Sequence, residues 1–330
     1  MSAGILDNDH AFYGGREPAW HRLGTVIDAD VVTAKEAMDL ARLNWTVEQH
    51  EVHAHIPTGM DTPDLTTIIP GKVANVRMDT GEALGIVGGR YHVVQNSEAF
   101  DFFDEIIGKG DAHYHTAGSL YNGRKIWALA RLNRDICIGG DTDEKIDPFV
   151  TLVNGHDGNT AVSVYTTPIR VVCQNTLQWS MEGTKNMWKG RHTPSITDKA
   201  RDARDMLGFS NAYFDELQAL GDSLIVQKID RVSFQRMLDM LVPLPSPKDE
   251  DSTRGLTIAE NTREAIHMAW DVDNIANVKY TKWGFVQAVA EYVDWGKNHR
   301  TDEKFLDQNV LGGATVPTLK DRSIKVALTA

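Results

Sequence analysis

Apolar and β-branched residues form two runs on either side of a short polar cluster in the middle of the chain. The runs are FVTLVN, which begins at Phe149, and TAVSVYTTPIRVVC, which begins at Thr160; the cluster between them is GHDGN. Gly, Asp and Asn supply the positive-φ positions that a tight turn needs, so the pattern predicts a strand, a turn and a second strand. Pro168 cannot donate to a ladder and indicates an edge, a bulge or a kink.

Other stretches alternate apolar and polar residues, or flank turn residues, as strands do. The sequence DTGE closes one predicted hairpin, and Asn122-Gly123 marks the turn of another. Together with the central pair, these stretches predict an antiparallel meander. They are 45–56, 68–78, 83–87, 113–120 and 125–132.

Helical spacing of apolar residues predicts several helices between and after the strands. Thr33 and Glu36 form a capping box that starts one helix, and Ser97 is the expected N-cap of another. The last residues, GGATVPTLKDRSIKVALTA, show no long helical pattern. The predicted helices are 34–43, one from Ser97 to Gly108, 198–221, one after Ser233, 258–270 and 282–298.

These elements predict an α+β fold, with an antiparallel twisted β-meander, packed helices and a small helical C-terminal region. The stretch VPLPSPKDEDSTRG is rich in proline and then in charge, as linkers are. We therefore expect a core domain over 1–241, a linker over 242–255 and a helical region over 256–330.

The composition is that of an ordinary soluble globular protein, and the cysteines indicate the cytoplasm. The 330 residues are 42% hydrophobic and 24% charged, and no apolar run approaches the length of a membrane span. The N-terminus lacks the basic start and apolar core of a signal peptide. We interpret Cys137 and Cys173, both in strand-like stretches, as reduced core residues.

The histidines and the glycine-rich turns suggest chemistry only weakly. His53/His55 and His113/His115 have metal-like spacing, but two ligands are too few for a site. His156-Asp157 resembles an acid–base pair, but turn geometry explains Asp-Gly better. The sequence of Gly88, Gly89 and Arg90 lacks the Lys-Ser/Thr of a phosphate loop. We expect no catalytic residue, no metal and no cofactor.

Charge is distributed unevenly along the chain. The net charge is −12, which argues against unspecific nucleic-acid binding, yet basic residues outnumber acidic ones from Ser163 to Arg204. Arg170 stands inside an apolar run, where it needs an ion-pair partner or a wet groove. Aromatic residues interleaved with basic ones are typical of single-strand binding. The candidate nucleic-acid contacts are Arg124, Lys125, Arg170, Trp179, Lys185, Trp188, Lys189 and Arg191.

Several blocks in a fixed order resemble a known family. They are Trp20-His21-x-Leu23-Gly24, GIVGGRYHVVQNSEAFDFF, AGSLYNGRKIWALARL, NGHDGNTAVSVYTTPIRVVCQNTL and KWGFVQAVAEYVD. The resemblance is to the phage- and plasmid-like family known as domain of unknown function nine-three-two, and it implies a phage or mobile-element protein in a bacterial cytoplasm. More weakly, a meander followed by a long helix is similar to the fold of single-strand annealing recombinases of the Redβ, Erf and Sak groups.

The first functional hypothesis is therefore ATP-independent binding and annealing of single-stranded DNA by a homo-oligomer. Two alternatives stay open. One is an enzyme of unknown reaction that uses His156, Asp157 and Cys173, or the His53/His55 pair. The other is a phage protein–protein interaction module.

Overall fold

The computed structural model describes the chain in several stretches and divides it into two compact units. One unit comprises Met1–Asn133, Val150–Tyr165 and Met187–Gly208, and the other comprises Arg134–Phe149, Thr166–Asn186 and Phe209–Ala330. The described residues are 10–14, 25–27, 31, 33–58, 64–107, 112–140, 144–170, 187–196, 199–245, 252–296 and 318–330, without the side chains of 170, 200–204, 206–210 and 252.

A large, mainly antiparallel sheet runs through the first unit. Its strand order is β11-β10-β9-β7-β6-β1-β2. The β1–β6, β6–β7 and β10–β11 pairs are antiparallel, and β1–β2 is parallel. The strands are β1 (Ala11–Gly14), β2 (Thr25–Ile27), β6 (Ala112–Leu120), β7 (Lys125–Leu132), β9 (Lys145–Gly155), β10 (Val162–Arg170) and β11 (Met187–Gly190). The predicted strand–turn–strand in the middle of the chain is confirmed as β9, its turn and β10.

Two helices contribute apolar side chains to the core of this unit. Helix α2 (Ala34–Leu40) begins at Thr33, whose side chain accepts a hydrogen bond from the Glu36 amide, as the capping pattern predicts. Helix α3 (Asn96–Ile107) buries Phe100 and Phe103. Both phenylalanines pack in one cluster with residues of the sheet, such as Leu152 and Val164.

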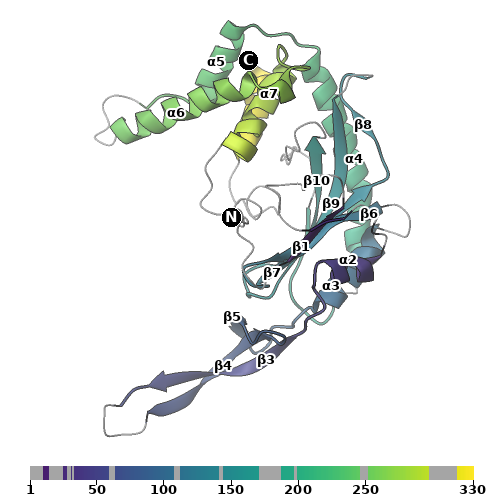
Figure 1. Ribbon diagram of the computed structural model, residues 1–330, viewed down its shortest axis with the longest axis vertical. Coiled ribbons are helices and arrows are strands. Elements are labelled where there is room, and N and C mark those ends of the chain that lie inside the picture. Colours follow the sequence, from purple (N-terminus) through teal and green to yellow (C-terminus); the bar gives the residue numbers. More distant parts are fainter. Residues whose placement is uncertain are drawn as a thin grey trace. The chain divides into compact units, whose positions relative to one another are not determined.

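A second, three-stranded sheet has the order β3-β4-β5 and is antiparallel throughout. Its strands are β3 (Val47–Ile56), β4 (Leu65–Arg77) and β5 (Ala83–Gly88). Because β5 pairs only with Lys72–Val76, β3 and β4 continue beyond it as a two-stranded ribbon (Figure 1). We call the described residues 47–56 and 65–72 the arm. The register changes within it, where Ile69–Lys72 of β4 lie opposite Val52 alone.

The second unit is largely helical. An aromatic cluster forms part of its core, in which the rings of Phe234 and Trp270 stack at 4.1 Å and Phe285 meets Phe234 edge-on. Strand β8 (Ile136–Cys137) pairs with the start of β9. The helices are α4 (Ala200–Ile225, of which 209–225 belong here), α5 (Arg231–Leu241), α6 (Ser252–Trp270), η2 (Asp273–Ile275), α7 (Lys282–Glu291), the π-helical turn η3 (Tyr292–Gly296) and α9 (Leu319–Thr329).

The C-terminus differs from the prediction. The last residues, in which no long helical pattern was expected, form the 11-residue helix α9 (Leu319–Thr329). Its start has a capping box in which Thr318 and Asp321 bond each other's backbone amides, a short signal that the sequence does contain. Helix α6 also begins at Ser252, ahead of the predicted 258.

The fold class is confirmed as α+β, with antiparallel strands, packed helices and a helical C-terminal region. The expected linker at 242–255 stays a prediction. Within the described stretches, no helix combines the length and the apolar character that crossing a membrane requires.

Candidate functional site

Two glycines allow the turn after β9 to lie directly against β5. A Cβ atom at Gly85 would stand 2.7 Å from the backbone oxygen of Asp157, and one at Gly158 would stand 2.7 Å from Cγ1 of Val87. Gly158 also has φ +78°, a conformation that glycine adopts without strain. The two most distinctive blocks of the sequence, GIVGGRY and NGHDGN, are therefore packed on each other.

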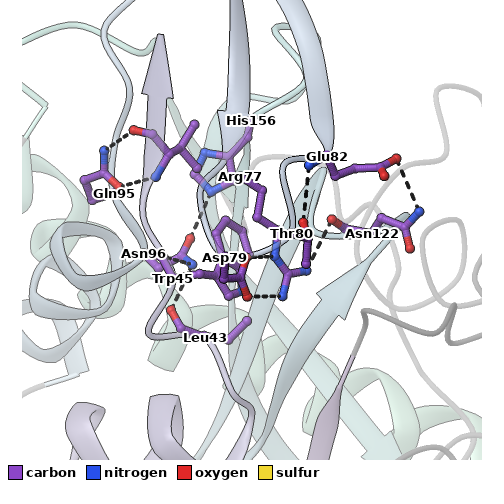
Figure 2. A network of polar contacts seen from close by, with 11 residues as sticks. Leu43, Trp45, Arg77, Asp79, Thr80, Glu82, Gln95, Asn96, Asn122 and His156 are labelled. Atoms are coloured by element: carbon purple, nitrogen blue, oxygen red, sulfur yellow. Dashed lines mark hydrogen bonds and ion pairs between the residues drawn. The ribbon is translucent and has the colours of Figure 1, made fainter. Parts of the chain in front are cut away.

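His156, in this turn, belongs to a buried polar network (Figure 2). Its Nε2 lies 2.9 Å from Oδ1 of Asn96, while Nδ2 of Asn96 donates to the backbone oxygens of Leu43 and Trp45. Since that amide group already donates through its nitrogen, its oxygen must accept, and Nε2 of His156 carries the proton. The backbone oxygen of His156 accepts from Nδ2 of Asn75 at 2.8 Å.

An arginine and a tryptophan extend the network to the hairpin turn between β4 and β5. The guanidinium carbon of Arg77 lies 4.5 Å from the centre of the Trp45 ring. The ring of His156 meets the same Trp45 ring edge-on, with 5.4 Å between the ring centres. Arg77 also donates twice to the carboxylate of Asp79 and once to the Asn122 backbone oxygen. These contacts hold Arg77 in the interior, where it is only 4% exposed. The guanidinium therefore has a structural role.

Tyr91 and His192 lie on the other side of the same turn. The two rings stack at 4.8 Å, and the Tyr91 hydroxyl donates to the Gly155 backbone oxygen at 3.0 Å. Nε2 of His192 lies 3.0 Å from the Thr160 backbone oxygen and so donates to it. Asp157 closes the turn, because its Oδ1 accepts from the amides of Asn159 and Thr160.

Burial keeps the ionisable rings of the site neutral. It lowers the pKa of His156 from 6.5 to about 3, with a smaller contribution from His192. Burial likewise lowers the pKa of His192 and raises that of the Tyr91 hydroxyl. An uncharged, fully buried His156 and an Asp157 that accepts hydrogen bonds within its own turn are better suited to structure than to proton transfer.

A pocket of about 470 Å³ opens beside Tyr91, lined by Gly71, Gly88, Gly89, Arg90 and Tyr91. No atom lies within 4 Å of a Cβ built at Gly71 or Gly88. The backbone is therefore uncovered, and a ligand could approach it closely. Arg90 is exposed and makes no hydrogen bond or ion pair to any described residue.

Two further arginines lie at the same end of the large sheet. The Arg124 backbone oxygen accepts from the His156 amide at 2.8 Å, so Arg124 lies next to the turn. Arg191 follows Gly190, which pairs with Val162 at the start of β10. Both side chains are exposed, and neither bonds to a side chain among the described residues. The glycine-lined pocket and Arg90, Arg124 and Arg191 form what we call the turn-end site.

The predicted contact residues are distributed unevenly. Arg124 and Arg191 belong to the turn-end site. Lys125 is half-buried, with its ammonium 5.8 Å from the Tyr121 ring centre, and Lys189 is exposed on β11. Trp188 is half-buried, and its ring centre lies 5.2 Å from that of Phe102. Trp179, Lys185 and the side chain of Arg170 lie outside the described residues, as does Cys173.

Sequence reasoning missed Arg90, Tyr91 and His192 as site residues. The motif GGRY reads as an ordinary turn, and His192 stands in a stretch that looks like a loop. The pairing of Tyr91 with Gly155 and His192 depends on contacts across the fold, which no local pattern carries. The glycine pair before Arg90 is the one local signal, because glycines often admit a ligand to the backbone.

Three of the four histidines in the predicted pairs contact a neighbouring side chain. Nε2 of His53 lies 3.6 Å from Glu51, and that of His55 lies 2.8 Å from Asp64. The His115 ring meets Tyr13 edge-on. Among the residues that the structure describes, no three His, Cys, Asp or Glu side chains are grouped so as to hold a metal ion.

Comparison with known proteins places the chain in a family without an assigned activity. Neither the curated proteins nor the solved structures contain a match to it. A family model described as a domain of unknown function, DUF932, matches residues 83–311, which is more than half of the chain. The matched range includes Gly88–Tyr91 of the pocket, Arg124, the HDG turn and His192. The chain therefore belongs to the DUF932 family, as its sequence blocks indicated.

Proposed function

We propose that this protein is a phage or mobile-element protein that binds single-stranded DNA without ATP in a bacterial cytoplasm, and that it anneals complementary strands as a homo-oligomer. The phosphates lie on Arg90, Arg124 and Arg191, and the bases face outward to pair with a second strand. Lys125 and Lys189 on the neighbouring strands extend the contact. No hydrolysis is needed, because pairing itself supplies the free energy.

The observation that supports this proposal best is the presence of three exposed arginines, Arg90, Arg124 and Arg191, on segments next to one turn. They come from distant parts of the sequence, yet their positions meet at the turn after β9. Guanidinium groups suit phosphate oxygens in number and geometry. Glycines with open space at Cβ allow a sugar–phosphate chain to approach the backbone.

Among the nearby carboxylates, Asp79 has a counter-ion, whereas Asp157 and Glu82 accept hydrogen bonds from neutral groups and keep a negative charge that the arginines must outweigh. Asp79 is paired with Arg77, and both oxygens of Asp157 accept hydrogen bonds within the turn. Glu82 accepts from the amide of Asn122. The acidic excess of the whole chain, at −12, weakens long-range attraction, so we expect binding that is strong only at low salt.

In this proposal, Trp188 packs against the core and stabilises β11, and it does not stack on a base. Its ring is half-buried against Phe102 and packs on the core of the unit. Tyr91, which lines the pocket, is the aromatic residue placed to contact a base or a sugar. Arg170, Trp179 and Lys185 stay candidate contacts.

Fluorescence anisotropy with a labelled oligothymidylate tests binding directly, measured over a salt series. We expect affinity to fall as salt rises, and R124A and R191A each to lower the slope of log K against log salt by ~0.7. K35A is the matched control, since Lys35 is exposed on α2 and pairs only with Asp39 there. Flat titrations at low salt, or an equal loss in K35A, would refute the proposal.

Annealing needs its own measurement. Two complementary strands with donor and acceptor dyes report pairing by energy transfer, without nucleotide or metal. We expect the native protein to accelerate pairing and R124A/R191A to accelerate it less. Acceleration that is equal for native protein and double variant contradicts the assigned site.

A further inference from the structure

The arm has one edge that is protected against strand addition and one that is open. On β4, Pro70 and the positive φ of Gly71 interrupt the outer edge, and β5 covers Lys72–Val76. On β3, Gln95 bonds both the amide and the oxygen of Val47, at 3.0 and 2.8 Å. From Gln49 to Ile56, β3 contains no proline, and no described strand pairs with that edge. Open edges of this kind accept further strands.

The arm also exposes aliphatic side chains that a lone ribbon does not normally carry. Ile56 is 46% exposed and its cross-strand partner Leu65 is 59% exposed. Side chains alternate between the faces of a strand, so Val52 and Ala54 share the face of Ile56. A two-stranded ribbon is marginally stable by itself in water, and a third strand would stabilise it.

We propose that β3 pairs antiparallel with β3 of a second copy of this chain, about a two-fold axis at Val52. This names the surface for the self-association proposed above. It does not depend on DNA binding, because the pairing residues of β3, Gln49–His55, are not part of the turn-end site.

The register follows from the backbone. The backbone N–H and C=O of Val47 point outward to Gln95. Because these groups alternate in direction along a strand, the backbone groups of Gln49, Glu51, His53 and His55 also point outward. A residue whose backbone N–H and C=O point outward must pair with such a residue of the partner strand. Because these residues are all odd-numbered, the two-fold axis passes through a residue and not between two. An axis at Val52 pairs Glu51 with His53 of the partner subunit and Gln49 with the partner's His55.

Charge selects this register among the alternatives. An axis at Glu51 would place that carboxylate opposite itself, and an axis at His53 would place two imidazoles together. The axis at Val52 gives two acid–histidine pairs instead, in which an imidazole N–H can donate to the carboxylate on the opposite strand. It also places Val52 opposite the partner's Val52, so that an apolar pair lies at the axis.

Charge exchange tests the pairing in the full chain, with the dimer constant measured by sedimentation. H53E puts a carboxylate opposite the partner's Glu51 twice, and we expect roughly tenfold weaker association. E51K/H53E restores opposite charges and should recover most of it. T66E, on β4 and outside the pairing edge, is the matched control. A protein that is monomeric throughout, or a dimer insensitive to H53E, overturns the proposal.

Cross-linking tests the axis itself. Opposed residues at a non-hydrogen-bonded position have Cα atoms about 4.5 Å apart, within the range of a disulfide. V52C should therefore form a covalent dimer on oxidation, whereas A54C, which would face the partner's His50, should form little. Equal cross-linking of both variants, or none, overturns the register. DNA titrations of the same variants should be unchanged, which separates failure of this proposal from failure of DNA binding.

Discussion

Nε2 of His156 donates to Oδ1 of Asn96 at 2.9 Å, across 60 residues of sequence. Both side chains are buried, with exposures of 0% and 1%. The bond ties the first residue of α3 to the turn after β9, and the same amide nitrogen reaches Leu43 at 2.9 Å. Asn96 thus connects three separate stretches of the first unit by one side chain.

Asn96→Ala should destabilise the protein strongly, because it leaves the His156 N–H and the Leu43 oxygen buried without partners. Each orphaned group costs about 1–3 kcal/mol, so we expect a loss of about 3 kcal/mol. Urea unfolding measures it. Asn159→Ala is the control, since that side chain is exposed in the same turn and should change stability by less than about 0.5 kcal/mol.

Gly85→Ala should disrupt the contact between β5 and the HDG turn. The new Cβ would stand 2.7 Å from the Asp157 backbone oxygen, and backbone cannot yield as a flexible side chain can. We expect a loss of about 1–3 kcal/mol in thermal or urea unfolding. Gly88→Ala in the same strand meets no atom within 4 Å and should be nearly neutral. Equal losses for the two variants would contradict this account of the contact.

The pKa of His156 gives stability a defined pH dependence. Its folded pKa of about 3 lies below the ordinary 6.5, so the unfolded chain binds more protons between these values. Stability is therefore complete above pH 6.5 and falls as the pH decreases towards 3. For one histidine the loss is about 2 kcal/mol between pH 6.5 and 5. His192 contributes in the same direction.

His156→Gln tests this linkage, because glutamine can donate to Asn96 but does not titrate. We expect the variant to be less stable at neutral pH, yet to lose less stability than the native protein between pH 7.5 and 5. Urea midpoints at the two pH values give both quantities. Parallel pH profiles for the two proteins would show that His156 is protonated in the folded state or solvated there.

The strands could be predicted because their signals are local. The GHDGN turn, the Asn122-Gly123 hairpin and the alternation from Trp45 to Ile56 each depend on neighbouring residues, and all three appear in the structure. The division into units could not be predicted, because β9, β10 and α4 each contribute residues to both. A composition change such as the one in 242–255 carries no information about interleaved units.

The turn-end site was only half predictable. Arg124 and Arg191 are recognisable in the sequence as charges beside turns. Tyr91 and His192 can be identified as site residues only from their stacked rings in the folded structure. His156 shows the opposite case, since the adjacent Asp157 suggested acid–base chemistry. Full burial and the bond to Asn96, which no neighbouring residue reveals, give it a structural role.

In the second unit, Lys320→Met should be strongly destabilising. Nζ of Lys320 lies 2.6 and 2.8 Å from the two carboxylate oxygens of Asp294, and the side chains are 5% and 3% exposed. The pair joins α9 to η3, and removing the lysine leaves a buried charge whose main counter-ion is gone, at a cost of about 3–5 kcal/mol. K320M/D294L removes both charges and should recover most of that loss in urea unfolding. A double variant no more stable than K320M would show that other partners of Asp294 dominate.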